Sequence, residues 1–335
     1  MKKTISLLFI LLFFGCAKDK TPNINCSACA GYDITQYQID DTGVKFPAGH
    51  IQVGSWHSYF QATDDSIIDF APAFNPRNSN EIVFVRKFYL GFPKLLDIVK
   101  MNIITKEQKV VFSGYIYTDV LNWSSSDWIF FEDYSTASIV KIKSNGDSLT
   151  YLTKNGDNSS PYLDDKNKLI YFNRSTNSLP RHLHVMDING NNISEISTNM
   201  YCTGVAPSGK YLISKNLAYE GITIYDIENK TKKTISLIGS IACNRWFPDS
   251  KTIMASSFHG TVELMLINAE TAEVRTVKTP CHDKEYTSFG ISQDCKSVVY
   301  QCTVRDTIDN ASTVKETYSL QQSDIYGKNF RSLRQ

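Results

Sequence analysis

The sequence has no strong charge of either sign and no long hydrophobic run. Its 335 residues include 35 basic and 34 acidic side chains, a formal net charge of +1. Such a chain lacks the electrostatic attraction on which general nucleic-acid binding depends, so we expect no nucleic-acid partner. The apolar run at residues 5–14 is interrupted only by Ser6. At about 1.5 Å per residue it is too short to cross a roughly 30 Å hydrocarbon core.

Short catalytic motifs are also missing. The sequence contains no Gly-x-Ser-x-Gly nucleophile elbow, no Walker phosphate loop, no Gly-x-Gly-x-x-Gly fingerprint and no His-Glu-x-x-His zinc motif. We therefore predict no catalytic residue, no resident cofactor and no metal site, which favours a binding protein over an enzyme.

The amino end has the pattern of an export signal. Lys2 and Lys3 precede the apolar run, which closes with Phe13-Phe14-Gly15-Cys16. This ending resembles the bacterial lipobox, although the positions of Phe13 and Phe14 are more commonly occupied by Leu and a small residue in that motif. The resemblance implies a signal peptide at residues 1–15 and palmitate-type acyl chains on Cys16, which would anchor the protein to a membrane. Ordinary signal cleavage and an uncleaved anchor are the alternatives.

The residues after Cys16 predict the destination and a tether. Ala17 follows the cysteine where an inner-membrane retention signal has Asp, so by resemblance the protein goes to the outer membrane, facing the periplasm or the outside. Residues 16–35 are polar and are predicted to be a flexible tether. Within them, Cys26-Ser27-Ala28-Cys29 allows a redox pair or half a zinc site, but a local disulfide or thiols in a linker is the simpler interpretation.

From about residue 65 a pattern recurs roughly every 40 residues. A bulky anchor residue precedes a polar turn, an apolar strand, a second strand, another polar turn and an outer strand. The anchors are Phe74, Trp123, Tyr162, Val205, Trp246 and Ile291. No helical period intervenes. Six such copies predict an all-β protein: a six-bladed β-propeller of four-stranded antiparallel blades within residues 36–335.

Three segments carry a resemblance to a known family. FAPAFNPRNSNEIVFV, TGVAPSGKYLIS and NRWFPDSKTIMAS, with the later turn MDINGNN, resemble the TolB-like six-bladed propeller family. The family's Ser-Pro-Asp-Gly turn is intact nowhere here. The resemblance implies the fold more than a function, because the family's repeat residues are structural. We expect the aromatic anchors to be buried, and long second turns at residues 86–94 and 304–315. The ring would close by face packing between the first and last blades, or by a strand from residues 51–61.

Histidines and cysteines offer weaker candidates. His182 and His184 alternate onto one face of a predicted third strand, a spacing that suits a metal but is also typical of an exposed strand face. Cys202 and Cys243 occupy equivalent places on adjacent inner strands, either as buried thiols or as a bond near the axis. Cys281, Cys295 and Cys302 lie close in sequence, so one bridge is expected among them in an oxidising envelope.

Topology suggests a binding surface. Loops that lead from one blade's outer strand to the next blade's inner strand gather at one mouth of the channel. Candidate binding residues there are Asp119, Asn122, Asp157, Asn158, Tyr201, Asn244, Arg245 and Tyr286. We predict a non-catalytic envelope lipoprotein that binds a protein or glycan through this mouth. The alternatives are a polysaccharide lyase or related glycan enzyme, using a channel-lined metal or carboxylates, and a structural spacer.

Overall fold

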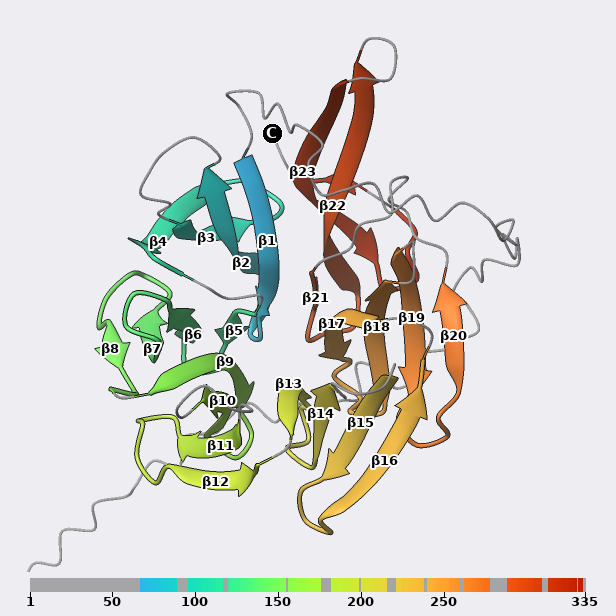
Figure 1. Ribbon diagram of the computed structural model, residues 1–335. Helices are drawn as coiled ribbons and strands as arrows, with labels where there is room; N and C mark the ends of the chain where they lie inside the picture. The colour runs from blue at the N-terminus through green and yellow to red at the C-terminus, as the bar shows by residue number, and fades with distance from the viewer. Residues whose placement is uncertain are drawn as a thin grey trace, which may run out of the picture.

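The structure, a computed structural model, describes residues 67–88, 96–116, 120–154, 156–175, 182–198, 200–215, 221–237, 240–258, 262–277, 288–308, 313–329 and 331–333. In these ranges the chain forms six four-stranded antiparallel sheets and no helix. The sheets follow one another around an axis (Figure 1). The predicted six-bladed propeller is therefore confirmed. None of the described residues belongs to a helix that could span a membrane.

Each blade takes four consecutive strands. Blades 1 to 3 contain β1 (Ile67–Asn75), β2 (Asn78–Phe88), β3 (Leu96–Asn102), β4 (Gln108–Gly114); β5 (Asn122–Trp123), β6 (Trp128–Asp133), β7 (Ser138–Lys143), β8 (Thr150–Tyr151); β9 (Asp157–Asp164), β10 (Leu169–Ser175), β11 (His182–Asp187), β12 (Ser194–Ser197). Blades 4 to 6 contain β13 (Tyr201–Val205), β14 (Tyr211–Lys215), β15 (Gly221–Asp226), β16 (Thr231–Ser236); β17 (Ser240–Trp246), β18 (Thr252–Phe258), β19 (Val262–Asn268), β20 (Val274–Val277); β21 (Phe289–Ile291), β22 (Ser297–Ile308), β23 (Thr313–Asp324), β24 (Arg331–Ser332). The first strand of each blade is the inner one, because these strands contact one another around the axis.

The turns after the inner strands are fixed by local side-chain hydrogen bonds. Asn75 Oδ1 accepts from the Arg77 N–H at 2.9 Å, and Asp249 Oδ1 accepts from the Lys251 N–H at 2.9 Å. Ser292 Oγ accepts from the Ser297 N–H at 2.9 Å. Asn, Asp and Ser commonly cap tight turns in this way, so the turns form without the family's complete turn motif.

The anchor residues fill the space between blades. Phe74, Trp123, Tyr162 and Trp246 are buried, as the repeat predicted. Burial raises the pKa of Tyr162 well above its usual value. The two aliphatic anchors, Val205 and Ile291, are half-buried. Removing the aromatic anchors from water contributes roughly 2–3 kcal/mol each to folding.

Blade 1 closes directly against blade 6. The Ala71 N–H donates to Ser288 Oγ at 2.9 Å, and this hydroxyl donates to Gln301 Oε1 at 2.9 Å, both within buried surroundings. Phe74 and Leu333 belong to one buried apolar cluster that spans the two blades. The described residues therefore close the ring by face packing, the first of the two predicted routes. Residues 51–61 lie outside the described ranges.

The predicted long turns are shorter than expected. β22 continues to Ile308 and pairs with β23 from Thr313, so most of residues 304–315 is strand. This hairpin extends beyond the rest of blade 6 (Figure 1). In blade 1, β2 likewise continues to Phe88. The sequence analysis missed these extensions because the segments are rich in charged and polar residues, which an extended hairpin accepts as readily as a loop does.

The cysteines divide into thiols and disulfides. Cys202 and Cys243 are buried thiols, so no bond joins them. Cys295 and Cys302 are both disulfide-bonded. Cys302 is five residues into β22, about 16 Å beyond Ser297 at roughly 3.3 Å per residue, whereas disulfide-bonded Cα atoms lie within about 7 Å. Cys295 and Cys302 are therefore not bonded to each other.

Candidate functional site at one mouth of the channel

The six inner strands give the channel two different ends. We call one end the turn mouth; it is formed by the turns between inner and second strands, at residues 76–77, 124–127, 165–168, 206–210, 247–251 and 292–296. We call the other end the loop mouth, where the chain enters each inner strand. The sequence prediction concerned the loop mouth.

A cavity of about 610 Å³ lies on the axis at the turn mouth. All six blades line it, and its volume lies within the usual range for ligand sites, about 300–1,000 Å³. The lining residues are Pro72, Ala73, Phe74, Pro76, Leu121, Asn122, Trp123, Ser125, Leu163, Asp165, Lys166, Lys168, Val205, Pro207, Ser208, Arg245, Trp246, Asp249, Ser250, Gly290, Ile291 and Gln293.

The cavity lining contains more cations than acids. Three cations, Lys166, Lys168 and Arg245, face two acids, Asp165 and Asp249. Asp165 accepts from Lys168 Nζ at 2.8 Å. Asp249 accepts from the Thr252 hydroxyl at 2.8 Å and from two backbone N–H groups. Three cations against two acids give the lining a formal net charge of +1, so the wall is weakly positive toward a ligand.

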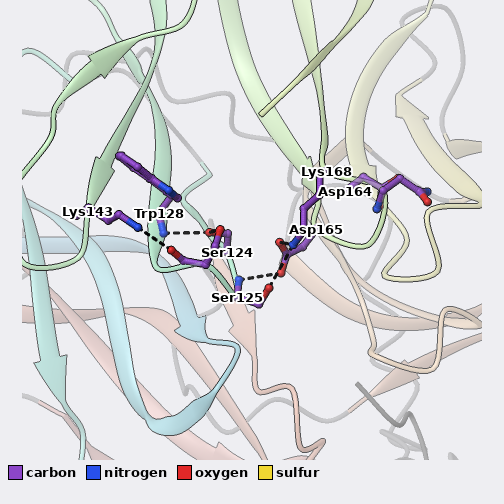
Figure 2. Close-up of polar contacts among 9 residues, drawn as sticks. Ser124, Ser125, Trp128, Lys143, Asp164, Asp165 and Lys168 are labelled. Atoms are coloured by element: carbon purple, nitrogen blue, oxygen red, sulfur yellow. Dashed lines mark hydrogen bonds and ion pairs between the residues drawn. The ribbon is translucent and has the colours of Figure 1, made fainter. Parts of the chain in front are cut away.

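Hydrogen bonds link neighbouring turns from blade 2 to blade 5. The Ser125 N–H donates to Asp165 Oδ2 at 2.7 Å, linking blades 2 and 3, as Figure 2 shows. Lys166 Nζ donates to the Ser208 carbonyl at 3.1 Å, linking blades 3 and 4. The Ser208 N–H donates to Ser250 Oγ at 2.8 Å, linking blades 4 and 5. These links preorganise the part of the mouth formed by blades 2 to 5, which lowers the entropic cost of binding there.

A glycine allows blades 3 and 4 to approach closely. Gly209 has φ of +68°, and a Cβ added to it would lie 2.6 Å from Asp164 Oδ2. Asp164 accepts from the Asn167 N–H and side-chain amide at 3.0 and 2.8 Å. A larger residue at position 209 would be strained at this positive φ and would displace the side chains of Asp164 and Asn167.

Two of the predicted binding residues line the cavity. Asn122 Nδ2 donates to the Pro161 carbonyl, at 2.6 Å, and its Oδ1 accepts from the Leu163 N–H at 3.3 Å. Arg245 Nη1 donates to the Asn244 carbonyl at 2.8 Å. Asn244 itself is buried in the wall between blades 4 and 5.

The other predicted residues lie elsewhere. Asp157, Asn158 and Tyr201 are at the start of inner strands, at the loop mouth. Asn158 is fully buried and bonds Arg174 Nε and two backbone carbonyls. Tyr201 lies within 3.2 Å of the Ser160 hydroxyl. Asp119, Tyr286 and the lipidation candidate Cys16 are outside the described residues.

Sequence reasoning missed most of the charged groups at the turn mouth. Asp165, Lys166, Lys168 and Asp249 stand in the polar turns after the anchors, and none of them was among our candidate binding residues. The missed signal was their placement: each turn follows an inner strand, and so all six meet at one mouth.

The two histidines lie on β11, the third strand from the axis, as predicted. His182 Nδ1 is 2.9 Å from Glu195 Oε2, and His184 Nε2 is 4.0 Å from the same oxygen. Burial lowers the pKa of His184. In the part of the chain that the structure describes, no three His, Cys, Asp or Glu side chains are grouped to hold a metal ion.

Solved structures resemble this fold. No protein-family model matches the sequence, and no curated protein does. The putative TolB of Agrobacterium tumefaciens is 16% identical over 70% of this chain and 86% of its own, with a TM-score of 0.55. TolB of Acinetobacter baumannii is 18% identical over 80% of this chain, which spans 63% of that protein, with a TM-score of 0.56. This chain has the TolB-like propeller fold.

The same propeller fold also occurs in an enzyme. An oligogalacturonate lyase in complex with manganese is 10% identical over 79% of this chain and 77% of its own, with a TM-score of 0.53. At such identities the likeness establishes the fold alone. The activity of this TolB-like propeller must therefore be argued from its own site.

Proposed function

We propose that the protein is a non-catalytic, lipid-anchored envelope protein that binds a peptide segment of a protein partner in the cavity at the turn mouth. The supporting observation is the 610 Å³ axial cavity lined by all six blades, with Lys166, Lys168 and Arg245 in its wall. A preformed concave site with a few polar groups is the usual form of a ligand site. The net positive wall favours a segment that carries carboxylates.

The lining favours a peptide over a glycan. A sugar ring is commonly held by stacking on an exposed aromatic face. Phe74, Trp123 and Trp246 are the aromatic residues among the described lining, and all three are buried. The remaining apolar lining comes from alanine, proline, leucine, valine and isoleucine, which suit peptide side chains.

Placement of a photoreactive amino acid tests this function. At position 166, on the exposed rim, it should cross-link a partner in living cells, and mass spectrometry should locate the joined segment. The matched control is position 232, which also carries an exposed lysine but lies on β16, the outer strand of blade 4. Equal cross-linking at both positions would contradict the proposal.

A synthetic peptide of the cross-linked segment then gives a quantitative test. The double variant Lys166→Ala/Arg245→Ala should weaken its binding about ten-fold or more, since charged contacts at such sites contribute on the order of 1–3 kcal/mol. Lys232→Ala should leave the affinity unchanged. Cleavage of oligogalacturonate by the purified protein would instead favour the lyase.

The anchor is tested separately. We propose acylation at Cys16, cleavage before it, and an outer-membrane location. Growth with an alkyne-bearing palmitate analogue should label the protein, and Cys16→Ser should remove the label and release the protein from membranes. Labelling of the Cys16→Ser variant would exclude this residue as the site.

A further inference from the structure

A second, smaller cavity lies beside the axial one. Its volume is about 60 Å³. Its lining is Val120, Asn122, Tyr162, Leu163, Thr203, Gly204, Val205, Asn244, Arg245 and Trp246. Half of these residues, Asn122, Leu163, Val205, Arg245 and Trp246, also line the axial cavity. We call it the side pocket, because it shares a wall with the channel.

Two buried polar atoms of the side pocket have no hydrogen-bond partner among the described residues: Asn244 Oδ1, an acceptor, and Trp246 Nε1, a donor. Asn244 is 3% exposed and Trp246 is 7% exposed. They are two residues apart on β17 and so project to the same side of the strand. Buried polar groups are nearly always satisfied, and an unsatisfied donor beside an unsatisfied acceptor indicates a place for a ligand.

The orientation of the Asn244 amide is fixed by its other atom. Asn244 Nδ2 donates to Thr203 Oγ1 at 2.9 Å. The Thr203 hydroxyl in turn donates to the Ile213 carbonyl, at 3.4 Å. Because that hydroxyl hydrogen is already used, Thr203 accepts from Asn244, and the carbonyl oxygen of Asn244 is left facing the pocket.

The corresponding tryptophan of blade 2 shows what is unusual about Trp246. Trp123 Nε1 donates to Asp127 Oδ1, four residues later, at 3.2 Å. The residue four positions after Trp246 is Ser250, whose hydroxyl accepts from the Ser208 N–H instead. The two anchors therefore have the same place in their blades, but only that of blade 5 keeps an N–H for something else.

Gly204 holds the side pocket open. A Cβ added there would lie 2.9 Å from Asn244 Oδ1 and 3.7 Å from Trp246 Cδ1, the ring atom next to Nε1. The donor and the acceptor thus both border the space above this glycine. The pairing of β13 with β14 is also irregular between Cys202 and Gly204, and such bulges re-aim neighbouring side chains.

We propose that the side pocket is a specificity subsite for one primary carboxamide, the side chain of an Asn or Gln in the bound peptide. Its carbonyl would accept from Trp246 Nε1, and its amide would donate to Asn244 Oδ1. A volume of 60 Å³ holds about four water-sized atoms, and the carboxamide has three heavy atoms. A carboxylate would place an acceptor against Asn244 Oδ1. An ammonium group would leave Trp246 unsatisfied and would lie near Arg245.

The identity of this subsite rests on the proposed function, but its chemistry can be tested without the partner. Acetamide is the probe, with acetate, methylammonium and methanol as comparisons. The chain has four tryptophans, so a ¹H–¹⁵N spectrum shows four indole N–H peaks, and Trp246→Phe assigns one by its loss. Acetamide should shift that peak saturably, with a dissociation constant in the millimolar range expected of so small a ligand. This dissociation constant should be at least ten-fold lower than those of the other three probes.

Gly204→Ala is the blocking variant. The φ of Gly204 is not in the left-handed region, and the atom nearest to the new Cβ is the side-chain oxygen of Asn244. The fold should therefore tolerate the change. The variant should keep all four indole peaks and lose the acetamide shift. An unshifted Trp246 peak with every probe would mean that the pocket takes only water, and tighter binding of methanol would mean a hydroxyl subsite. Either result overturns the carboxamide assignment.

The peptide from the cross-linking experiment separates the two proposals. Replacing its Asn or Gln by Met should weaken binding about ten-fold in the native protein and have no effect in Gly204→Ala. A peptide whose binding does not depend on any carboxamide would remove the subsite and leave the proposed function standing. If acetamide binds but no partner is cross-linked, the carboxamide subsite stands and the proposed function is removed.

Discussion

The loop mouth and the turn mouth use polar residues in different ways. At the loop mouth, Asn158 is fully buried, and its side-chain amide is hydrogen-bonded to Arg174 and to two backbone carbonyls. At the turn mouth, Lys166 is exposed and links two blades through a single bond to Ser208. The first arrangement stabilises a blade, whereas the second leaves charge facing a cavity. Position at the end of an inner strand does not by itself make a residue available to a ligand.

The largest expected effect is at the loop mouth. Asn158→Ala removes three hydrogen bonds from a buried site and should lower the free energy of unfolding by about 3 kcal/mol. Urea denaturation measures the change. Lys154→Ala, an exposed neighbour, should stay within about 0.5 kcal/mol of the native protein. Peptide binding by the folded Asn158→Ala protein should be unchanged, and a loss of affinity without a loss of stability would reverse our assignment of the two mouths.

A pair of glycines gives the next largest effect. In Gly290→Ala the new Cβ would lie 2.6 Å from the Pro72 carbonyl oxygen, a backbone atom of the blade 1 junction. Such overpacking should lower the free energy of unfolding by about 2 kcal/mol. Gly204→Ala instead meets the end of a side chain, Asn244 Oδ1 at 2.9 Å, and should cost less. Equal destabilisation of the two variants in the same denaturation assay would show that the blade 1 junction is not rigid.

Acid should affect the face of the turn mouth. Backbone N–H groups, first those of Asn191 and Asn229, lower the pKa of Asp187 and Asp226 in the outer turns. When the pKa of a carboxyl is lower in the folded than in the unfolded state, its ionised form stabilises the fold. This contribution is fully present above the unfolded-state pKa and is lost as the pH falls through the folded-state pKa. We expect the urea concentration at the denaturation midpoint to decrease once the pH is below about 4. Asp187→Asn should make this decrease smaller. An unchanged acid response in that variant would exclude Asp187 as a source.

The smallest expected effect concerns the alkylation of a buried cysteine, Cys202. Burial raises the pKa of Cys202, beside the loop mouth, to about 12, so almost no thiolate is present at pH 8. Iodoacetamide should leave Cys202 unmodified in the native protein and alkylate it once urea unfolds the chain, as mass spectrometry of the peptide can show. Rapid native labelling would mean that the loop mouth opens more readily than its hydrogen bonds indicate.

The fold was largely predictable, whereas the candidate site was predictable only in part. Repeats of anchor, turn and strand predicted six blades and the burial of Phe74, Trp123, Tyr162 and Trp246. Of the eight predicted binding residues, Asn122 and Arg245 line the axial cavity and Asn244 lines the side pocket. Asp157, Asn158 and Tyr201 lie at the opposite end. The lipid anchor stays a prediction.

The sequence by itself determined the number of blades, the order of strands and the buried anchors, because each blade is one continuous stretch whose alternation and turn residues act locally. Tertiary structure alone decided which mouth holds the cavity and which atoms remain without partners there. Contacts such as Ser125 with Asp165, or Asn244 with Thr203, join blades about 40 residues apart. A repeat period fixes that separation along the chain, but the side chains that meet across it depend on how neighbouring blades pack.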